Sequence, residues 1–188
     1  MATNGVPILQ FSATCRPQAI KCILNNLKIK EDDMNIIHGE LTRKEITIVQ
    51  VPMRFSLASC KDLLNLYGPN SLIPDKSLVP TLIYSTTRAL TIQALSVIND
   101  ARQTPGGHNE PNSSFARLFH ACTGDLEKEK VISDFKDGKF PVISSTMALG
   151  LGQNWKRVSQ VIHVGHGYTS TIFQMIGWCG QGGNPGLA

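Results

Sequence analysis

Hydroxyl and cationic side chains stand directly after a predicted buried strand, in the run Ser85-Thr86-Thr87-Arg88. Hydroxyls, a guanidinium and the amino end of the next helix together form a group that can bind a phosphate. The competing interpretation is structural, because Thr87 is also a suitable N-cap for that helix. The sequence leaves both interpretations open.

Comparable loops are predicted after three other strands, at residues 120–124, 145–154 and 165–168. In an α/β sheet, the loops at the carboxyl ends of the strands meet at one edge, where ligands bind. We therefore expect these loops and residues 85–88 to lie close together. The alternative for residues 145–154 is an ordinary connection with glycines at its turns.

Histidines and cysteines raise the question of a metal or a nucleophile. His163, His166 and Cys179 invite a zinc interpretation, as does His120-x-Cys122. Zinc sites usually bring four ligands at recognisable spacing, and a strand-end H-x-x-H does not place both imidazoles on one face. A cysteine–histidine nucleophile would also need a third, orienting group. Ordinary histidines are favoured, and no zinc is predicted.

Regular alternation of β and α patterns begins at Leu78 and predicts a parallel sheet with helices on both faces. Asp125 is expected to cap its helix. The predicted strands span 78–84, 116–121, 140–144 and 158–164, and the predicted helices span 88–102, 125–136 and 170–176.

The first part of the chain is less regular. We expect a strand over 6–11, then a helix that begins near Pro17 and has one apolar face. Residues 45–51 are β-rich, 56–67 have helical spacing, and 70–76 form a linker. The resulting division is 1–40, 41–77 (an entry strand, helix and linker) and 78–188.

Composition limits the classes of function. The 188 residues are 41% hydrophobic and 17% charged, which excludes a disordered polyelectrolyte and fits little more than one domain. The net charge of +4 allows a weak DNA-facing surface. We expect an intracellular, unsecreted protein without a membrane span, because there is no long apolar run, signal peptide or C-x-x-C motif.

Four motifs, taken in order, resemble those of the second RecA-like lobe of RecQ-like, superfamily 2 DNA helicases. They occupy residues 82–88, 119–121, 144–152 and 174–177, and Ser12-Ala13-Thr14 resembles the motif that ends the first lobe. The resemblance implies a 3′-5′ DNA helicase that uses ATP and Mg²⁺, with a nuclear role in DNA repair and recombination. It also implies a first lobe of which residues 1–40 are a remnant.

The resemblance assigns roles to individual residues as well. The implied nucleic-acid contacts are Ser85, Thr86, Thr87, Arg88, His120, Thr146, Gly150 and Gly152. The implied residues of the nucleotide cleft are Thr14, Gln153, Asn154, Gln174, Gly177 and Gly180.

The chain departs from the family in its last motif, where the pattern Gln-x-x-Gly-Arg-x-Gly-Arg-Asp is expected. Trp178 and Gln181 stand at the two arginine positions, and Gly182 replaces the aspartate. Such an arginine contributes a factor of about 10³ to 10⁵ to the rate of phosphoryl transfer. No phosphate-binding loop or Asp-Glu motif is present either. We therefore expect DNA binding without ATP turnover; the alternatives are an inactive scaffold and an unrelated small α/β enzyme.

Overall fold

The computed structural model describes residues 6–12, 15–39, 43–149 and 155–188. These residues form a six-stranded parallel sheet in the order β1-β6-β5-β2-β4-β3. This confirms the predicted α/β fold. The strands are β1 (Ile46–Thr47), β2 (Thr81–Ser85), β3 (Ala116–Phe119), β4 (Val142–Ser145), β5 (Gln160–Val164) and β6 (Gly186–Leu187).

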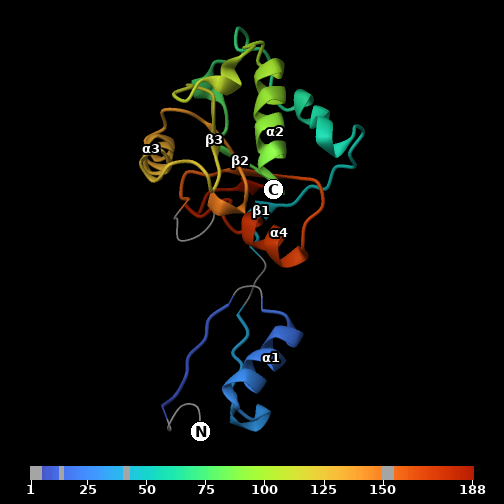
Figure 1. The fold of residues 1–188 in the computed structure, drawn as a ribbon, viewed down its shortest axis with the longest axis vertical. Helices are drawn as coiled ribbons and strands as arrows, with labels where there is room; N and C mark the ends of the chain where they lie inside the picture. The colour runs from blue at the N-terminus through green and yellow to red at the C-terminus, as the bar shows by residue number, and fades with distance from the viewer. Residues whose placement is uncertain (1–5, 13–14, 40–42, 150–154) are drawn as a thin grey trace.

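Helices cover both faces of this sheet (Figure 1). Helix α2 (Arg88–Ala101) packs on one face, whereas α3 (Asp125–Lys136) and α4 (Thr169–Ile176) pack on the other. The central strand β2 shows why: Leu82 and Tyr84 enter the core under α3 and α4, and Ile83 enters the core under α2. A parallel strand buried on both faces needs apolar residues at every position, which explains the continuous run in β2.

The ends of the helices follow from local chemistry. The Thr87 side chain accepts a hydrogen bond of 3.2 Å from the Leu90 N–H, so Thr87 caps α2 as predicted. At α3 the expected cap is wrong, because Gly124 is the N-cap and Asp125 is the first helical residue. Asp125 still lies in the positive first turn, and Lys136 lies in the negative last turn.

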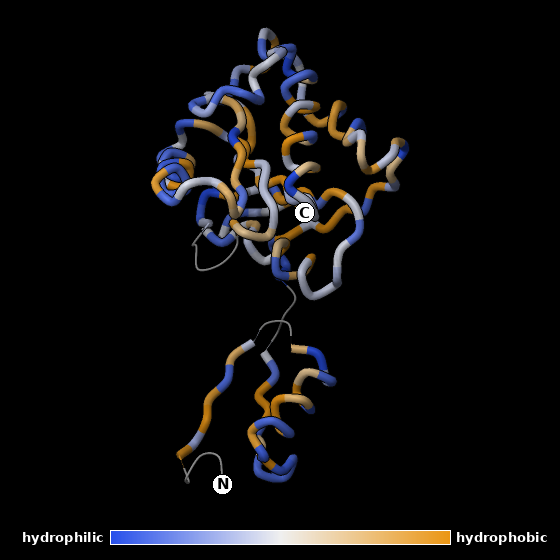
Figure 2. Tube along the Cα trace, viewed as in Figure 1, coloured by the Kyte–Doolittle hydropathy of each residue, from blue (hydrophilic) through white to orange (hydrophobic). Residues whose placement is uncertain are grey.

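The segment before residue 40 contains α1 (Pro17–Leu27), set apart from the sheet in Figure 1. The predicted strand over 6–11 is wrong: residues 6–12 are extended and exposed, and no described strand pairs with them. Figure 2 shows hydrophobic stretches in this part of the chain. Apolar alternation alone does not make a strand, since a strand also needs a neighbour for its backbone groups.

Residues 56–67 do not form the expected single helix. Two short 3₁₀ helices, Leu57–Ser59 and Lys61–Asn65, are separated by Cys60, whose φ of 51° is left-handed. The break places Cys60, Leu63 and Tyr67 in the core under α2. The apolar residues are spaced in this way because they are buried, whereas the backbone forms 3₁₀ turns, which are tighter than those of an α-helix.

The linker after residue 70 is held by a buried cation. The Arg102 guanidinium, fully buried, donates to the Asn70 Oδ1 at 2.7 Å and to the Asp75 Oδ1 at 2.6 Å. Asp75 also accepts a hydrogen bond from the Ser114 hydroxyl at 2.8 Å.

Among the described residues, no helix is long and apolar enough to cross a membrane.

Candidate nucleic-acid interface

The carboxyl ends of four neighbouring strands lie level with one another. Ser85 is in register with Val164, and Ser145 is in register with both Tyr84 and Phe119. The loops that follow β2, β3, β4 and β5 therefore start side by side at one edge of the sheet. This agrees with the expectation for residues 85–88, 120–124 and 165–168, and for residues 145–149, the described part of the predicted loop 145–154.

Two cations act on His120 at this edge: Arg88 is the first residue of α2, and Lys128 belongs to α3. Burial lowers the pKa of the His120 imidazole, and the positive charges of Arg88 and Lys128 lower it further. The Thr123 hydroxyl accepts a hydrogen bond of 3.2 Å from the His120 backbone N–H and fixes the start of the loop. Lys128 forms an ion pair of 3.1 Å with the Asp125 carboxylate, so Arg88 is the exposed cation that these residues offer to a ligand.

The predicted phosphate-binding run divides into exposed and buried members. Thr86 and Arg88 are exposed, whereas Thr87 is exposed but engaged in capping α2. Ser85 is only 1% exposed, and its hydroxyl has no hydrogen-bond partner among the described residues. Thr86 and Arg88 are thus the members of the run best placed to contact a ligand.

The loop after β4 is described only up to residue 149. Thr146 is half-buried, and its hydroxyl accepts a long hydrogen bond, 3.4 Å, from the Ala148 N–H. Its carbonyl accepts hydrogen bonds from the Ser145 hydroxyl and the Leu149 N–H. The remaining predicted residues of this loop and of the first-lobe motif lie outside the described residues: Gly150, Gly152, Gln153, Asn154 and Thr14.

The loop after α4, residues 177–183, lies near the amino ends of the strands. The Gly180 N–H donates to the Val158 carbonyl at 2.9 Å, just before β5 begins. The Gly180 backbone therefore lies at the amino end of β5, whereas residues 85–88 follow the carboxyl end of β2. Gln174 is exposed on α4, Gly177 is half-buried and Gly180 is buried.

Both residues at the arginine positions of this loop point inward. Trp178 is 6% exposed and packs against Tyr84, with ring centroids 5.2 Å apart. The Gln181 Oε1 accepts a hydrogen bond of 2.7 Å from the Trp155 N–H, and its Nε2 donates to the Gly177 carbonyl at 3.3 Å. Indole and amide therefore hold the loop to its own domain instead of presenting donors to a ligand.

Comparison with protein families decides the assignment. Residues 75–183 match the model of the helicase conserved C-terminal domain. The chain belongs to this family. The match confirms the coarser part of the resemblance, a helicase C-terminal domain of superfamily 2.

Individual relatives agree with this assignment at low identity. The chain is 24% identical, over 188 residues, to the ATP-dependent helicase wrn-1 of Caenorhabditis elegans. The match includes 97% of this chain but only 16% of wrn-1. The DUF1998 helicase MrfA bound to DNA and AMPPNP has a similar fold, with a TM-score of 0.55 and 17% identity over 76% of this chain and 19% of MrfA. MrfA bound to DNA alone gives a TM-score of 0.52 with 16% identity over 71% and 18% of the two chains.

The sequence did not predict a role for Arg43, which contacts the loop after α4. Its guanidinium donates to the carbonyls of Gly177, Cys179 and Gly180 at 3.0, 3.0 and 2.8 Å. It also forms an ion pair with Glu45. A backbone hydrogen bond at Glu45 lowers the pKa of the Glu45 carboxyl, and Arg43 lowers it further. Nothing in the sequence marks a pairing across 134 to 137 positions.

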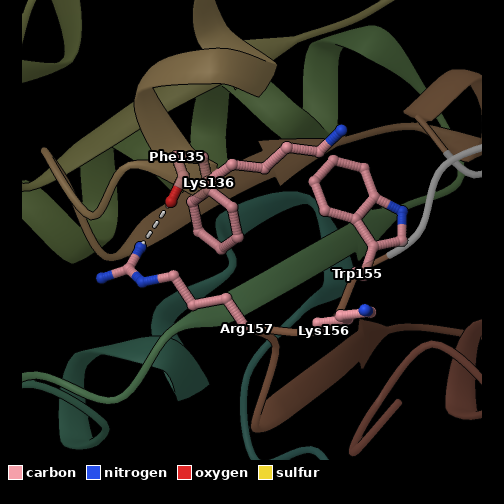
Figure 3. A pocket seen from close by; sticks show the side chains of 5 residues that line it. All are labelled: Phe135, Lys136, Trp155, Lys156 and Arg157. Atoms are coloured by element: carbon pink, nitrogen blue, oxygen red, sulfur yellow. Dashed lines mark hydrogen bonds between the residues drawn. The ribbon is translucent and has the colours of Figure 1, made fainter. Parts of the chain in front are cut away.

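A second group of cations lies near the amino ends of the strands, around a cavity of about 240 Å³ (Figure 3). Lys136, Lys156 and Arg157 line it together with Phe135 and Trp155. The Arg157 guanidinium donates to the Phe135 carbonyl at 2.8 Å and lies over the Phe135 ring. The pair Lys156-Arg157 is visible in the sequence, but its proximity to Lys136 depends on the fold.

ATP and Mg²⁺ are the cofactors that the family resemblance implies, and the described residues do not fit them. Trp178 is buried against Tyr84, and Gln181 uses both its amide oxygen and its amide nitrogen within the domain. No group of three or more histidine, cysteine, aspartate or glutamate side chains is placed to hold a metal ion in the described ranges. We therefore derive no step of nucleotide chemistry for this chain.

Proposed function

We propose that this helicase domain is the second RecA-like lobe of a RecQ-like 3′-5′ DNA helicase, and that this chain by itself binds the DNA backbone without turning over ATP. The observation that carries the proposal is the register of the strands, which brings residues 85–88 and 120–124 to one edge of the sheet, where Arg88 is exposed. An exposed cation at an edge where several loops meet suits phosphate contact, and phosphate contact is independent of base sequence.

The RecQ-like assignment rests on the ordered motifs and on the similarity to wrn-1. A DNA partner is supported by the bound DNA in the MrfA structures, whose fold this chain shares. ATP and Mg²⁺ would act in a complete enzyme with a first lobe. A nuclear location and a role in DNA repair and recombination follow from the same proposal.

An inactive scaffold is the second candidate, and the inward-facing Trp178 and Gln181 favour it. A lobe whose last motif is part of its own core has lost the donors that the chemistry requires. Such a domain could serve as a protein-interaction module. The two candidates differ in whether the cationic edge binds DNA.

The test is binding of a fluorescein-labelled oligothymidylate, followed by anisotropy over a series of salt concentrations. With about three phosphate contacts, the slope of log affinity against log salt should be near −2 for a single strand. Arg88→Ala should weaken binding and flatten the slope by less than about one unit. Lys76→Ala, an exposed cation ahead of β2, should leave both unchanged.

Affinity that does not depend on salt, or equal effects of the Arg88 and Lys76 variants, would favour the scaffold. ATP hydrolysis is measured on the same nuclease-treated protein. We expect no DNA-stimulated phosphate release, and its appearance would contradict the inactive last motif.

A further inference from the structure

The cavity of about 240 Å³ near the amino ends of the strands has an apolar floor and a cationic lining. Phe135 and Trp155, both buried, form the floor, and their ring centroids lie 5.9 Å apart. The remaining residues of the lining are Lys136, Lys156 and Arg157, so no acidic side chain of the described residues belongs to it. Figure 3 shows the three cations around the two rings.

Arg157 is held in place by backbone carbonyls. Its Nη1 donates to the carbonyls of Phe135 and Phe140 at 2.8 and 3.0 Å, and its guanidinium lies 5.1 Å from the centroid of the Phe135 ring. A guanidinium carries five N–H donors. Within the described part of the chain, neither Nε nor Nη2 has an acceptor, so these donors are available to a ligand.

The Arg157 charge has no carboxylate partner among the residues that the structure describes. Burial lowers the pKa of its guanidinium, because a half-buried charge loses part of its hydration. The two acids at the end of α3 are engaged elsewhere: Asp134 pairs with Arg117 and Lys139, and Asp137 also pairs with Lys139. Since buried charges in proteins are ordinarily paired, a cation in this state suits an anionic ligand.

A purely structural role for Arg157 is the alternative. Its contact with the Phe135 carbonyl places positive charge at the carboxyl end of α3, which stabilises a helix. A helix end carries only about half of one negative charge, however, and this does not balance Lys156 and Arg157 together. The cavity therefore stays positive after the helix end is taken into account.

We infer that this cavity binds a phosphate group, with Lys156 and Arg157 as the residues that contact it. A phosphate monoester carries a charge of about −1.5 to −2 near neutral pH, and its oxygens match the fork of a guanidinium. The apolar floor limits the access of water, which strengthens the attraction between the charges. The inference is independent of the proposed DNA binding, because Arg157 precedes β5 whereas Arg88 follows β2.

The test is a titration of the ¹⁵N-labelled protein with inorganic phosphate at constant ionic strength, set with sodium chloride. The signals to follow are the indole N–H of Trp155 and the Nε–H of Arg157. Trp178 is the only other tryptophan in the chain and serves as an internal reference. We expect saturable shifts at Trp155 and Arg157 with a Kd of about 1 mM, and no saturable shift at Trp178.

Matched variants locate the binding site. Lys156→Gln removes one exposed charge, and we expect about fivefold weaker phosphate binding. Arg157→Lys keeps the charge but loses the fork, and we expect about tenfold weaker binding. The control is Lys61→Gln, an exposed cation in the 3₁₀ helix on the α2 face, which should change binding less than about twofold.

Circular dichroism checks that the variants are folded. Lys156→Gln leaves every described hydrogen bond in place, so this variant tests the site even if Arg157→Lys unfolds the domain. The absence of a saturable shift at Trp155 and Arg157, equal shifts with acetate, or equal effects of the Lys156 and Lys61 variants would overturn the inference.

Competition identifies the source of the phosphate group. Oligothymidylate is added to the phosphate-saturated Arg88→Ala variant, in which the proposed DNA contact is weakened. Displacement of inorganic phosphate from Trp155 and Arg157 would assign the site to a polynucleotide backbone. Phosphate that stays bound would assign the site to small phosphorylated molecules. Both results support a phosphate site, and neither depends on whether the loops around Arg88 bind DNA.

Discussion

The two regions that carry helicase motifs differ in the direction of their side chains. At the carboxyl edge of the sheet, Arg88 is exposed at the start of α2, and burial and the Arg88 charge lower the pKa of His120. In the loop after α4, Trp178 is buried against Tyr84, and Gln181 bonds to Trp155 and Gly177. A motif position can thus remain at an exposed surface, or become part of the core that holds the domain together.

The difference has a physical cause. An arginine needs water or an anion around its charge, whereas an indole gains free energy by leaving water. Once Trp178 entered the core, restoring the charge requires burying it or opening the loop. The comparison predicts large effects on stability in one region and moderate effects on binding in the other.

The largest expected effect belongs to Trp178. Trp178→Ala should lower the free energy of unfolding by about 3 to 5 kcal/mol, and Trp178→Arg should destabilise the domain as well, because it adds a buried charge. Urea unfolding measures both, and Phe173→Ala on the exposed side of α4 is the control. An arginine variant as stable as the original chain would show that this side chain can turn outward.

The double variant Trp178→Arg, Gln181→Arg should still hydrolyse no ATP.

Arg43 should have the next largest effect. Arg43→Met removes three hydrogen bonds to carbonyls of residues 177–180, and we expect a loss of about 2 kcal/mol in the free energy of unfolding, allowing for the partial exposure of the guanidinium. Lys44→Met, an exposed neighbour, should change stability by less than about 0.5 kcal/mol. Similar losses for the two variants would remove the special role of Arg43.

Two variants of Gln181 distinguish the effect of its acceptor oxygen from the effect of a charge at the same position. Gln181→Leu leaves the Trp155 N–H without its partner and should cost about 1 to 2 kcal/mol in urea unfolding. Gln181→Glu keeps an acceptor oxygen at the same position and should cost less than the leucine variant. If glutamate proves the more harmful substitution, the hydrogen bond to Trp155 is not what Gln181 contributes.

The smallest effect concerns pH. The pKa of His120 lies below its ordinary value of 6.5. As the pH falls below 6.5, the unfolded chain takes up a proton at this residue more readily than the folded domain does, so the folded domain loses stability. A protonated imidazole would add one cation to the edge. Between about pH 7 and pH 5, DNA affinity should rise about two- to fourfold more for the original chain than for His120→Gln, with exposed His38→Gln as the control.

The sequence predicted the elements whose patterns are local. Strand β2 and helix α2 follow from a continuous apolar run, a threonine cap and helical spacing, and the structure places both within a few residues of the predicted bounds. Residues 6–11 and 56–67 failed because their apolar residues reflect burial or the need for a partner, which spacing does not record. The Arg43 contacts, and the cations of Figure 3, depend on residues far apart in the chain.

The most direct test of the account is an amide chemical-shift titration of the ¹⁵N-labelled protein with oligothymidylate at low and moderate salt. The account predicts the largest shifts in residues 85–88 and 120–124, weaker shifts at higher salt, and little change in residues 177–183. Shifts concentrated in residues 177–183, with the loops around Arg88 and His120 unchanged, would contradict it.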